Sequence, residues 1–540
     1  MGIMRKTEKI EVLDTTLRDG AQAEGINFSL QDKLEVLKAL DELGVAWIEA
    51  GNPGSNPKDM EFFALAHDMK LEHAKLCAFG STRKKGIKAA LDPNIKSLLD
   101  ANTPGVTIFG KAWDFHVKDV LGVSNEENLS MISETVAFFK EKGRFVFFDA
   151  EHFFDGWVSN TAYSLAALKA ALEAGADRII LCDTNGGNFP DIIAKAVTDA
   201  ASVCGGKSVL GIHAHNDTDM ASANTLAAVN AGCRHIQGTL AGFGERCGNA
   251  NLSSIIPSLE LKLWYTCLPK GKLEKLSALT RKVAEIANVV FNDNMPYVGT
   301  HAFSHKAGMH ADAMLKESKS FEHIAPGLVG NDRHFLVSEV GGRSAIAERA
   351  RRIDPSITKD HPVSAALVKK LKTLEAEGWA FEGADASFEL LIRRELGLYK
   401  SLFNIEAYRV VSEHPTGETI SCSHAWVKVL VDGRYEIAAA EGDGPVNAMD
   451  SALRRALKRF FPELEQVRLS DYKVRVIDGN AATAAKVRVL ITSSDGKRSW
   501  VTVGVSGDII EASRAALTDS IEYKLIGDSE RKSKAKRAKA

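Results

Sequence analysis

Apolar stretches alternate with amphipathic ones along the first half of the chain. Eight short runs rich in Val, Ile and Phe have the length and composition of buried strands. They lie at residues 10–14, 45–51, 75–80, 105–110, 144–151, 178–184, 208–212 and 235–242. Between them, segments such as 30–43, 161–174 and 217–231 carry apolar residues at helical spacing and end before a glycine. The pattern therefore predicts strands and helices in strict alternation.

Strict alternation predicts a parallel sheet, because each helix carries the chain back to the start of the next strand. Eight such units in about 250 residues predict an α/β fold of the (β/α)8, or TIM, barrel type. A doubly wound open sheet is the alternative. In a barrel, the active site lies at the C-terminal ends of the strands.

Polar side chains follow most of the predicted strands. Any one of them could be there because strands end at the surface, but their convergence at one rim indicates an active site. The positions are Asp14 with 15–22, Glu49, Asp149, Glu151, Asp183, Thr184, His213, His215 and 242–249.

The two histidines of the seventh predicted strand, His213 and His215, are two residues apart. Successive side chains of a strand point to opposite faces, so both rings should lie on the same face. This spacing suits two ligands of one metal ion. The alternative is a pair of polar residues on a solvated strand face.

The C-terminal part of the chain follows a different pattern, with helices first and then strands joined by turns. Segment 426–433 parallels segment 486–491, and an Asp-Gly hairpin signal and a helix rich in small residues follow each of them. The repeat predicts two similar units packed with pseudo-symmetry. We expect a barrel at 1–265, helical subdomains at 266–390, an α+β regulatory domain at 391–528 and a disordered basic tail at 529–540.

Composition adds mainly exclusions. A formal net charge of -2 over 540 residues gives no indication of a nucleic-acid or anionic membrane partner. No apolar run approaches the roughly 20 residues that span a bilayer, and the N-terminus has no signal-peptide core. The seven scattered cysteines, with no Cys-x-x-Cys pair, are typical of free thiols in a reducing cytoplasm.

Four stretches resemble the signatures of the metal-dependent acyltransferases that carry out Claisen condensations, namely 13–22, 48–49, 213–217 and 244–250. This family includes 2-isopropylmalate, homocitrate and citramalate synthases, and the hydroxymethylglutaryl-CoA lyases are related to it. The match covers the barrel and extends more loosely to about residue 525. Stretches 51–59, 79–86 and 108–114 resemble the branch that condenses pyruvate with acetyl-CoA. One position departs from many relatives, which carry glycine where this chain has Asp219.

The resemblance implies an enzyme that condenses acetyl-CoA with pyruvate, gives (R)-citramalate and CoA, and serves isoleucine synthesis. An alternative within the family is a synthase acting on another 2-oxo acid, as 2-isopropylmalate and homocitrate synthases do. A lyase is a second enzyme class, but lyases of this group generally lack a C-terminal repeat domain. A non-enzymatic binding protein would have no need for an arginine, an aspartate and two histidines at one site.

The same resemblance implies roles for particular residues. Asp19, His213 and His215 would bind a divalent metal, Mn²⁺, Mg²⁺, Zn²⁺ or Co²⁺, with Asn249 as a fourth ligand. Arg18 would bind the keto oxygen and stabilise negative charge, although a structural salt bridge is the alternative.

Four further roles follow from the family match. Glu49 would orient Arg18, and Thr184 would donate a hydrogen bond to the 2-oxo acid carboxylate. Glu151 would lie near the acetyl group, and His310, in a motif at 297–312, would reach over a barrel, often the partner's. The general base stays open between Glu151 and His310. No glycine-rich phosphate cradle for CoA is present in the sequence.

The C-terminal repeat resembles the family's regulatory domain, in which an end-product amino acid binds between the units, usually at a dimer interface. We therefore expect a homodimer with isoleucine as feedback effector, and the turn with Gly442 and Gly444 as a place where an amino acid could bind. A domain that only dimerises is the alternative.

Overall fold

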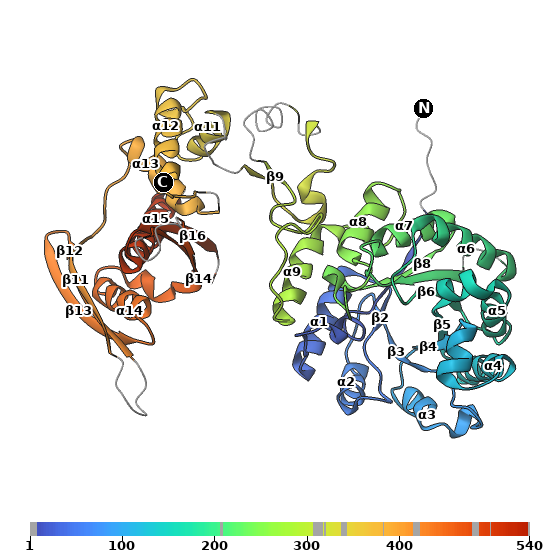
Figure 1. Ribbon diagram of the computed structural model, residues 1–540. Helices are drawn as coiled ribbons and strands as arrows, with labels where there is room; N and C mark the ends of the chain where they lie inside the picture. The colour runs from blue at the N-terminus through green and yellow to red at the C-terminus, as the bar shows by residue number, and fades with distance from the viewer. Residues whose placement is uncertain are drawn as a thin grey trace. The chain divides into compact units, whose positions relative to one another are not determined.

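The computed structural model describes residues 8–205, 209–305, 317, 320–335, 343–381, 383–413, 422–477, 485–496 and 498–537. The chain packs into two compact units, coloured blue to yellow-green and yellow to red in Figure 1. The first unit is Met1–Phe303 with Ile324–Arg333, and the second is Ser304–His323 with His334–Ala540. The search of the described helices for one long and apolar enough to cross a membrane found none.

The first unit contains a closed barrel of parallel strands (Figure 1). Its strands are β1 (Glu11–Asp14), β2 (Trp47–Glu49), β3 (Lys75–Ser81), β4 (Gly105–Lys111), β5 (Phe145–Glu151), β6 (Arg178–Asp183), β7 (Leu210–Ala214) and β8 (His235–Gly238). β1 pairs with β8 as well as with β2, which closes the sheet. The (β/α)8 barrel predicted from the sequence is confirmed, and the open sheet is excluded.

Helices follow the strands in turn around the barrel. They are α1 (Leu30–Leu43), α2 (Pro57–His67), α3 (Pro93–Asp100), α4 (Asn125–Glu141), α5 (Phe153–Glu173), α6 (Pro190–Val203), α7 (Ala221–Ala231), α8 (Leu252–Leu261) and α9 (Leu276–Ile286). α1 shows why the bounds fall where they do. Ser29 and Asp32 form a capping box at its start, and Gly44, with φ of 91°, ends it.

The interior of the barrel is layered. Apolar side chains, including Leu13, Trp47 and Phe147, fill its middle. Below them, at the N-terminal ends of the strands, the Glu11 carboxylate accepts hydrogen bonds from Arg178 Nε at 2.9 Å and His235 Nδ1 at 3.0 Å. Above them, the C-terminal ends of the strands carry the polar residues of the candidate site.

The second unit contains two three-stranded antiparallel sheets, each followed by a helix. The first set is β11 (Asn404–Glu413), β12 (Cys422–Val431), β13 (Arg434–Gly442) and α14 (Pro445–Lys458); the second is β14 (Arg468–Val476), β15 (Val487–Ser494), β16 (Ser499–Ser506) and α15 (Ile509–Arg537). α14 packs on β12 and β13, and α15 packs on β15 and β16. The predicted internal repeat is thus confirmed.

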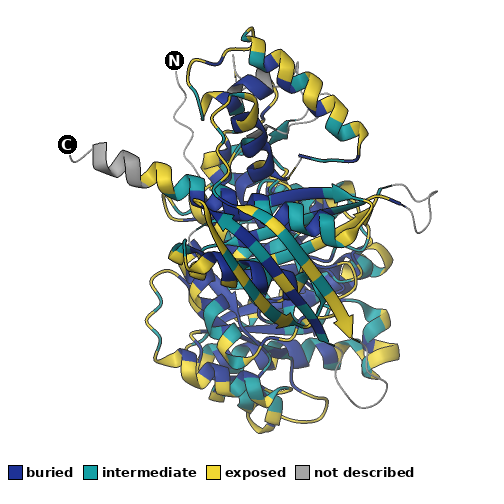
Figure 2. Ribbon diagram, turned by 90° about the vertical axis from the view of Figure 1, so that its left-hand side faces the viewer, coloured by how far each residue is buried: buried dark blue, intermediate teal, exposed yellow. Residues whose placement is uncertain are grey.

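Buried and exposed residues alternate along the strands of this unit, as the β11–β13 sheet shows in Figure 2. One face of each sheet meets its helix, and the residues between them are apolar. Ahead of the sheets lie the helices α11 (Arg343–Arg351), α12 (Pro362–Ala376) and α13 (Asp385–Glu395). The short elements of the unit include β9 (Ser304–His305), β10 (His334–Phe335) and the 3₁₀ turn η9 (Pro462–Gln466).

The structure bears on two expectations about chain organisation. The chain changes from the first unit to the second after Phe303, so the boundaries expected at residues 265 and 390 stay predictions about finer subdomains. The disordered tail expected from residue 529 stays a prediction, and the structure describes residues 529–537 as the end of α15. Lys, Arg, Glu and Ala are good helix formers and extend a helix that tertiary packing has already started. The ion pair of Glu530 with Arg393, at 2.6 Å, ties this extension to α13.

Candidate metal centre and catalytic pocket

Three side chains from two different barrel loops meet above the apolar layer. His213 lies near the end of β7, His215 just after it, and Asp19 follows β1 in a turn whose N–H groups donate to Thr15 O. The two Nε2 atoms lie 3.3 Å apart. Asp19 Oδ2 is 3.3 Å from His213 Nε2 and 4.0 Å from His215 Nε2. All three side chains are buried.

The hydrogen bonds of these groups fit a bound cation. His213 Nδ1 lies 3.1 Å from Gln237 Oε1, which can only accept, so Nδ1 carries the hydrogen and the lone pair sits on Nε2. That lone pair faces the Nε2 of His215 and the carboxylate of Asp19. Lone pairs of three buried groups repel one another unless a proton or a metal ion lies between them.

Unpaired atoms point to the same conclusion. Asp19 Oδ1, His215 Nδ1 and Asn249 Oδ1 are buried side-chain atoms without a hydrogen-bond partner among the described residues. Asn249 Nδ2 donates to Phe243 O at 3.1 Å, so its Oδ1 is left as an acceptor, and its backbone bridges to His215. Its amide oxygen therefore suits a fourth metal ligand.

The pKa values of His215 and Asp19 favour the protonation states that a metal needs. Burial lowers the pKa of His215 to about 3, so this imidazole is neutral near pH 7. Burial alone would raise the pKa of Asp19, but the neighbouring Arg18 charge holds it well below its usual range. Asp19 is thus an anion and His215 a neutral donor at neutral pH.

Arg18 is held between two carboxylates at the edge of this centre. Its Nε donates to Glu49 Oε1 at 2.6 Å and its Nη1 to Asp19 Oδ2 at 2.9 Å. The guanidinium carbon lies 3.8 Å from the centroid of the Phe79 ring. Glu49 is fully buried, so it fixes the guanidinium rather than exchanging it for water. Nη2 has no hydrogen-bond partner within the described ranges, which leaves it to a bound molecule.

A pocket of about 210 Å³ opens above the three metal-binding candidates. Thr184 lines it, and because its Oγ1 accepts from His152 N at 2.9 Å, the hydroxyl hydrogen is free to donate. Glu151 also lines it and forms an ion pair with Lys111. The lining includes Arg18, Asp19, Phe79, Phe109, Asp149, Glu151, Thr184, His213, His215 and Arg246.

The structure does not place all predicted site residues around this pocket. Glu49 is not part of its lining and acts only through its hydrogen bond to Arg18. Asn249 lies beside His215 through the backbone bridge. His310 lies outside the described residues.

Comparison with known proteins places the chain in a family. The HMGL-like family matches residues 9–283, about half of the chain. The (R)-citramalate synthase of Aquifex aeolicus is 51% identical over 523 residues, which cover 97% of this chain and 99% of that protein. The enzyme of the same name from Geobacter sulfurreducens is 47% identical, covering 96% and 97%.

The chain belongs to the (R)-citramalate synthase family. A probable 2-isopropylmalate synthase of Methanopyrus kandleri is only 31% identical over 518 residues, so the identities favour this branch over the alternative expected from the sequence. Residues 297–378 match the "Homocitrate synthase post-HMGL domain-like" family. Residues 382–525 match the "LeuA allosteric (dimerisation) domain".

One buried residue of this family member, Gln237, was missed from the sequence, and it contacts Asp149, which was predicted at the rim without a role. Gln237 accepts from His213, and its Nε2 donates to Asp149 Oδ1 at 3.1 Å. Burial, with the nearby Glu49 charge, raises the pKa of Asp149 to about 7. The sequence does contain an indication of Gln237: it is a polar residue inside a short apolar strand. A polar side chain buried there requires a hydrogen-bond partner.

Asp219, where many relatives carry glycine, has a φ of 61°. Aspartate tolerates this left-handed conformation better than most residues, and its Oδ1 accepts from Asn216 Nδ2 at 3.3 Å. The departure affects the backbone after β7 and leaves the metal-binding candidates unchanged.

Proposed function

We propose that this chain condenses acetyl-CoA with pyruvate to give (R)-citramalate and CoA, in isoleucine biosynthesis. The observation that carries the proposal is the cluster of Asp19, His213 and His215 beside Arg18 in one barrel pocket. Asp19, His213 and His215, with Asn249, would hold a divalent metal (Mn²⁺, Mg²⁺, Zn²⁺ or Co²⁺), which supplies Lewis-acid polarisation of the keto carbonyl.

The chain's own residues suit the remaining steps. Glu151 is proposed to take a proton from the acetyl methyl group, with Lys111 holding its carboxylate in place. The methyl carbon then bonds to the keto carbon of pyruvate, and the keto oxygen takes up negative charge. Arg18 Nη2 is proposed to bind that oxygen, and this is supported by Nε and Nη1 being held by Glu49 and Asp19.

Two steps complete the reaction. A proton converts the alkoxide to the hydroxyl group of citramalate, and water cleaves the thioester to a carboxylate and the free thiol of CoA. His310 is proposed to deliver the proton and to activate that water, in the role the family resemblance gives it. Thr184 is proposed to hold the pyruvate carboxylate through its free hydroxyl hydrogen.

The size of the pocket favours a small 2-oxo acid. The Phe79 and Phe109 rings stack at its wall with centroids 5.1 Å apart. We propose that these rings limit the room beyond the keto carbon, so that a methyl group is accepted more readily than a branched chain. This supports pyruvate over 2-oxoisovalerate.

The test is thiol release from acetyl-CoA with pyruvate, 2-oxoisovalerate, 2-oxobutyrate and 2-oxoglutarate in turn, with and without divalent metal. We expect pyruvate to give the highest kcat/KM and a chelator to abolish turnover. A preference for 2-oxoisovalerate would assign 2-isopropylmalate synthase activity instead. Turnover that a chelator leaves unchanged would contradict the metal centre.

We also propose that the chain is a homodimer. The outer face of the β11–β13 sheet exposes large apolar side chains, with Trp426 38%, Tyr435 58% and Ile437 62% exposed. Exposed apolar residues gathered on one face are typical of a protein–protein interface. Light scattering at micromolar concentration should give twice the chain mass of 58.5 kDa. A monomer would contradict the proposal.

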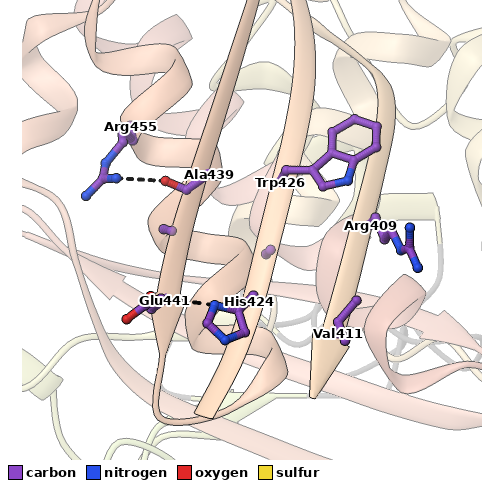
Figure 3. Close-up of a pocket in the computed structure, with 9 residues that line it drawn as sticks. Arg409, Val411, His424, Trp426, Ala439, Glu441 and Arg455 are labelled. Carbon is purple, nitrogen blue, oxygen red and sulfur yellow. Dashed lines mark hydrogen bonds and ion pairs between the residues drawn. The ribbon is translucent and has the colours of Figure 1, made fainter. Parts of the chain in front are cut away.

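Isoleucine is the proposed feedback effector, and an open pocket of about 480 Å³ on the same sheet supports it. Figure 3 shows His424 and Trp426 on the middle strand, with Arg409 and Val411 on one side and Glu441 on the other. An arginine, a carboxylate and apolar groups are the partners that the carboxylate, ammonium and side chain of an amino acid require.

The turn with Gly442 and Gly444, expected to mark the effector site, follows Glu441 directly and stays a prediction. Gly442 has a packing reason of its own, because a Cβ there would lie 2.4 Å from Ala448 N. Roughly 1 mM isoleucine, an order of magnitude, should inhibit turnover and raise the Tm. The Glu441→Gln variant should lose this response, and leucine serves as the control ligand. No effect of isoleucine on either quantity would exclude it.

A further inference from the structure

The loop after β8, residues 241–249, contains an arginine to which the proposed reaction gives no role. Arg246 has a φ of 57°, in the left-handed region that side chains other than glycine rarely adopt. Backbone strain of this kind persists only where surrounding contacts fix it, and strained residues gather at functional sites. The Arg246 side chain also lines the catalytic pocket. The contacts of its guanidinium group therefore indicate what this conformation serves.

The guanidinium group of Arg246 joins the loops that follow three neighbouring strands. Its Nε and Nη2 donate to the two carboxylate oxygens of Asp217, after β7, at 2.7 and 3.0 Å. Nη2 also donates to the backbone oxygen of Thr184, after β6, at 2.8 Å. β6 pairs with β7 and β7 pairs with β8, so the three loops leave the same rim side by side. A planar guanidinium makes these bonds as a fork, which a lysine ammonium does not reproduce.

A contribution to stability alone does not account for this contact. The side chain of Arg246 is 40% exposed and that of Asp217 is 23% exposed. An ion pair this open to water contributes little to folding. Arg246 and Thr184 both line the catalytic pocket, and the proposed function assigns the substrate carboxylate to the Thr184 hydroxyl. The bond to Thr184 is therefore the contact that bears on the substrate.

The metal-binding candidates of the same loops are held by backbone contacts instead. A backbone bridge joins His215 to Asn249. Next to it, Asn216 N donates to Gly248 O at 2.9 Å. These contacts connect the loops after β7 and β8 without any side chain. We therefore expect the metal ligands to keep their places when the guanidinium group is removed.

Thr184 lies one residue beyond the paired part of its strand, because β6 ends at Asp183. Its Oγ1 accepts from His152 N at 2.9 Å, and its backbone oxygen accepts from Arg246 Nη2. The two bonds hold the residue from two sides, and together they set the place and direction of the hydroxyl group. Loss of the second bond should displace the hydroxyl group while the loop after β5 keeps the first.

We propose that Arg246 is a positioning residue for the substrate carboxylate: by holding the backbone of Thr184, it fixes the hydroxyl group that binds the 2-oxo acid. The inference rests on the proposed function. It gives the left-handed backbone and the ion pair one purpose. The backbone conformation brings the side chain to the loop after β6, and Asp217 orients the guanidinium fork so that Nη2 reaches Thr184 O.

The test is a double-mutant cycle of Arg246→Lys and Thr184→Val in the full-length protein. We expect Arg246→Lys to raise the KM for pyruvate roughly tenfold, as the loss of one well-placed hydrogen bond predicts. The kcat should stay unchanged, because a contact made equally before and during the reaction affects only KM. The KM for acetyl-CoA and the metal affinity should also keep their wild-type values. In the Thr184→Val background, Arg246→Lys should have no further effect on the KM for pyruvate.

Arg454 provides the matched control, because it makes the same kind of contact in the second unit. Its Nε lies 2.8 Å from both carboxylate oxygens of Asp450, and its Nη1 donates to Val467 O at 2.9 Å. Arg454→Lys removes a similar fork and should leave the KM for pyruvate unchanged. Arg246→Gly guards against misfolding, since glycine adopts a φ of 57° without strain. It should raise the KM for pyruvate at least as much as Arg246→Lys.

Three results would overturn the proposal: an unchanged KM for pyruvate in both Arg246 variants, additive effects in the cycle, or an equal rise in Arg454→Lys. A loss of metal affinity or a rise in the KM for acetyl-CoA of similar size would also overturn it, since the role of Arg246 would then be structural.

Failure of the proposed function would be seen in the wild type. Preference for another 2-oxo acid would contradict pyruvate as the substrate, and the cycle run with that acid would still test Arg246. Wild-type protein that turns over none of the acids would contradict the reaction. The cycle is then measured as the calorimetric affinity for pyruvate in the presence of Mn²⁺, where Arg246→Lys should weaken binding only if Thr184 is present.

Discussion

The two ends of the barrel use the same kinds of residue for different purposes. Each end places a carboxylate beside a histidine and an arginine: Glu11, His235 and Arg178 at the N-terminal ends of the strands, and Asp19, His213 and Arg18 at the C-terminal ends. At the N-terminal end, both oxygens of Glu11 accept hydrogen bonds, from Arg178, His235 and Trp47.

At the C-terminal end, the ligand atoms that Asp19, His213 and His215 offer lie within 4.8 Å of one another. Asp19 Oδ1 and Asn249 Oδ1 are also buried there without a hydrogen-bond partner among the described residues. His235 Nε2 is also unpaired at the opposite end, but it stands alone there, and its ring packs on Phe147. The comparison teaches that a carboxylate paired with a histidine and an arginine does not by itself mark a site. A group of possible ligand atoms that lie within 4.8 Å of one another does.

The largest effect should follow the replacement of Asp19 by asparagine. The amide keeps the shape but removes the negative charge that faces His213 and Arg18, so metal binding and charge stabilisation should both fail. We expect turnover to fall by roughly 10³-fold, together with loss of the metal from the purified protein. Circular dichroism should show a folded protein. Near-normal turnover of the Asp19→Asn variant would contradict the claim that only the C-terminal end of the barrel is catalytic.

The matched change at the other end is Glu11→Gln, which should affect folding and leave catalysis intact. Removing this carboxylate leaves Arg178 without its charge partner at the base of the barrel. We expect the free energy of unfolding to fall by about 3 kcal/mol, with unchanged turnover per folded molecule. Urea denaturation and active-site titration measure the two quantities. A Glu11→Gln variant that is as stable as the wild type but inactive would show that Glu11 serves catalysis rather than stability.

The Glu11 effect should also depend on pH. Burial opposes ionisation, but the hydrogen bond and charge of His235 and the charge of Arg178 lower the pKa of Glu11 to about 2, against an ordinary value of 4.5. Its stabilisation is therefore complete above about pH 5 and is lost as the pH falls through 4.5 toward 2. Urea midpoints of the wild type and Glu11→Gln should differ most at about pH 7 and converge only near pH 2. A constant difference would contradict the shifted pKa.

A smaller effect is expected from Gln237→Met, at a fully buried residue between the two ends of the barrel. Methionine cannot accept the hydrogen bond from His213 Nδ1 as Gln237 does, so it no longer fixes which ring nitrogen of His213 carries the hydrogen. We expect metal affinity to fall by roughly 10- to 100-fold, with turnover recovering at saturating metal. Metal titration of activity checks this, and Met is close to Gln in volume. Turnover that excess metal does not restore would indicate a structural role instead.

Periodicity predicts the barrel well because each strand and helix carries its own pattern. Leu30–Leu43 begins and ends where its capping residues and glycine indicate. α5 begins at Phe153, ahead of the expected Thr161. The earlier start was not predicted because Asn160, with φ of -150° and ψ of 76°, interrupts the helix and breaks its apolar spacing. The apolar spacing therefore predicts the part of α5 that follows Asn160 but not the part that precedes it.

The residues of the site also divide into those that a local sequence pattern predicts and those that depend on the tertiary fold. The His213 and His215 spacing is a local feature, and their shared face follows from the strand. Gln237 depends on the register that sets β8 beside β1 and β7, with Gln237 opposite Leu13, which no local pattern contains. The extension of α15 to Arg537 was missed because charge suggested a solvated tail, whereas helix propensity and the Glu530–Arg393 ion pair decide its conformation.

The central claim is that the C-terminal end of the barrel is built around one divalent cation. Calorimetric titration of chelator-treated protein with Mn²⁺, for the wild type and His215→Ala, tests it most directly. The account predicts one tight site per chain in the wild type and its loss in the variant. Absence of that site in the wild type, or equal binding by the variant, would contradict it.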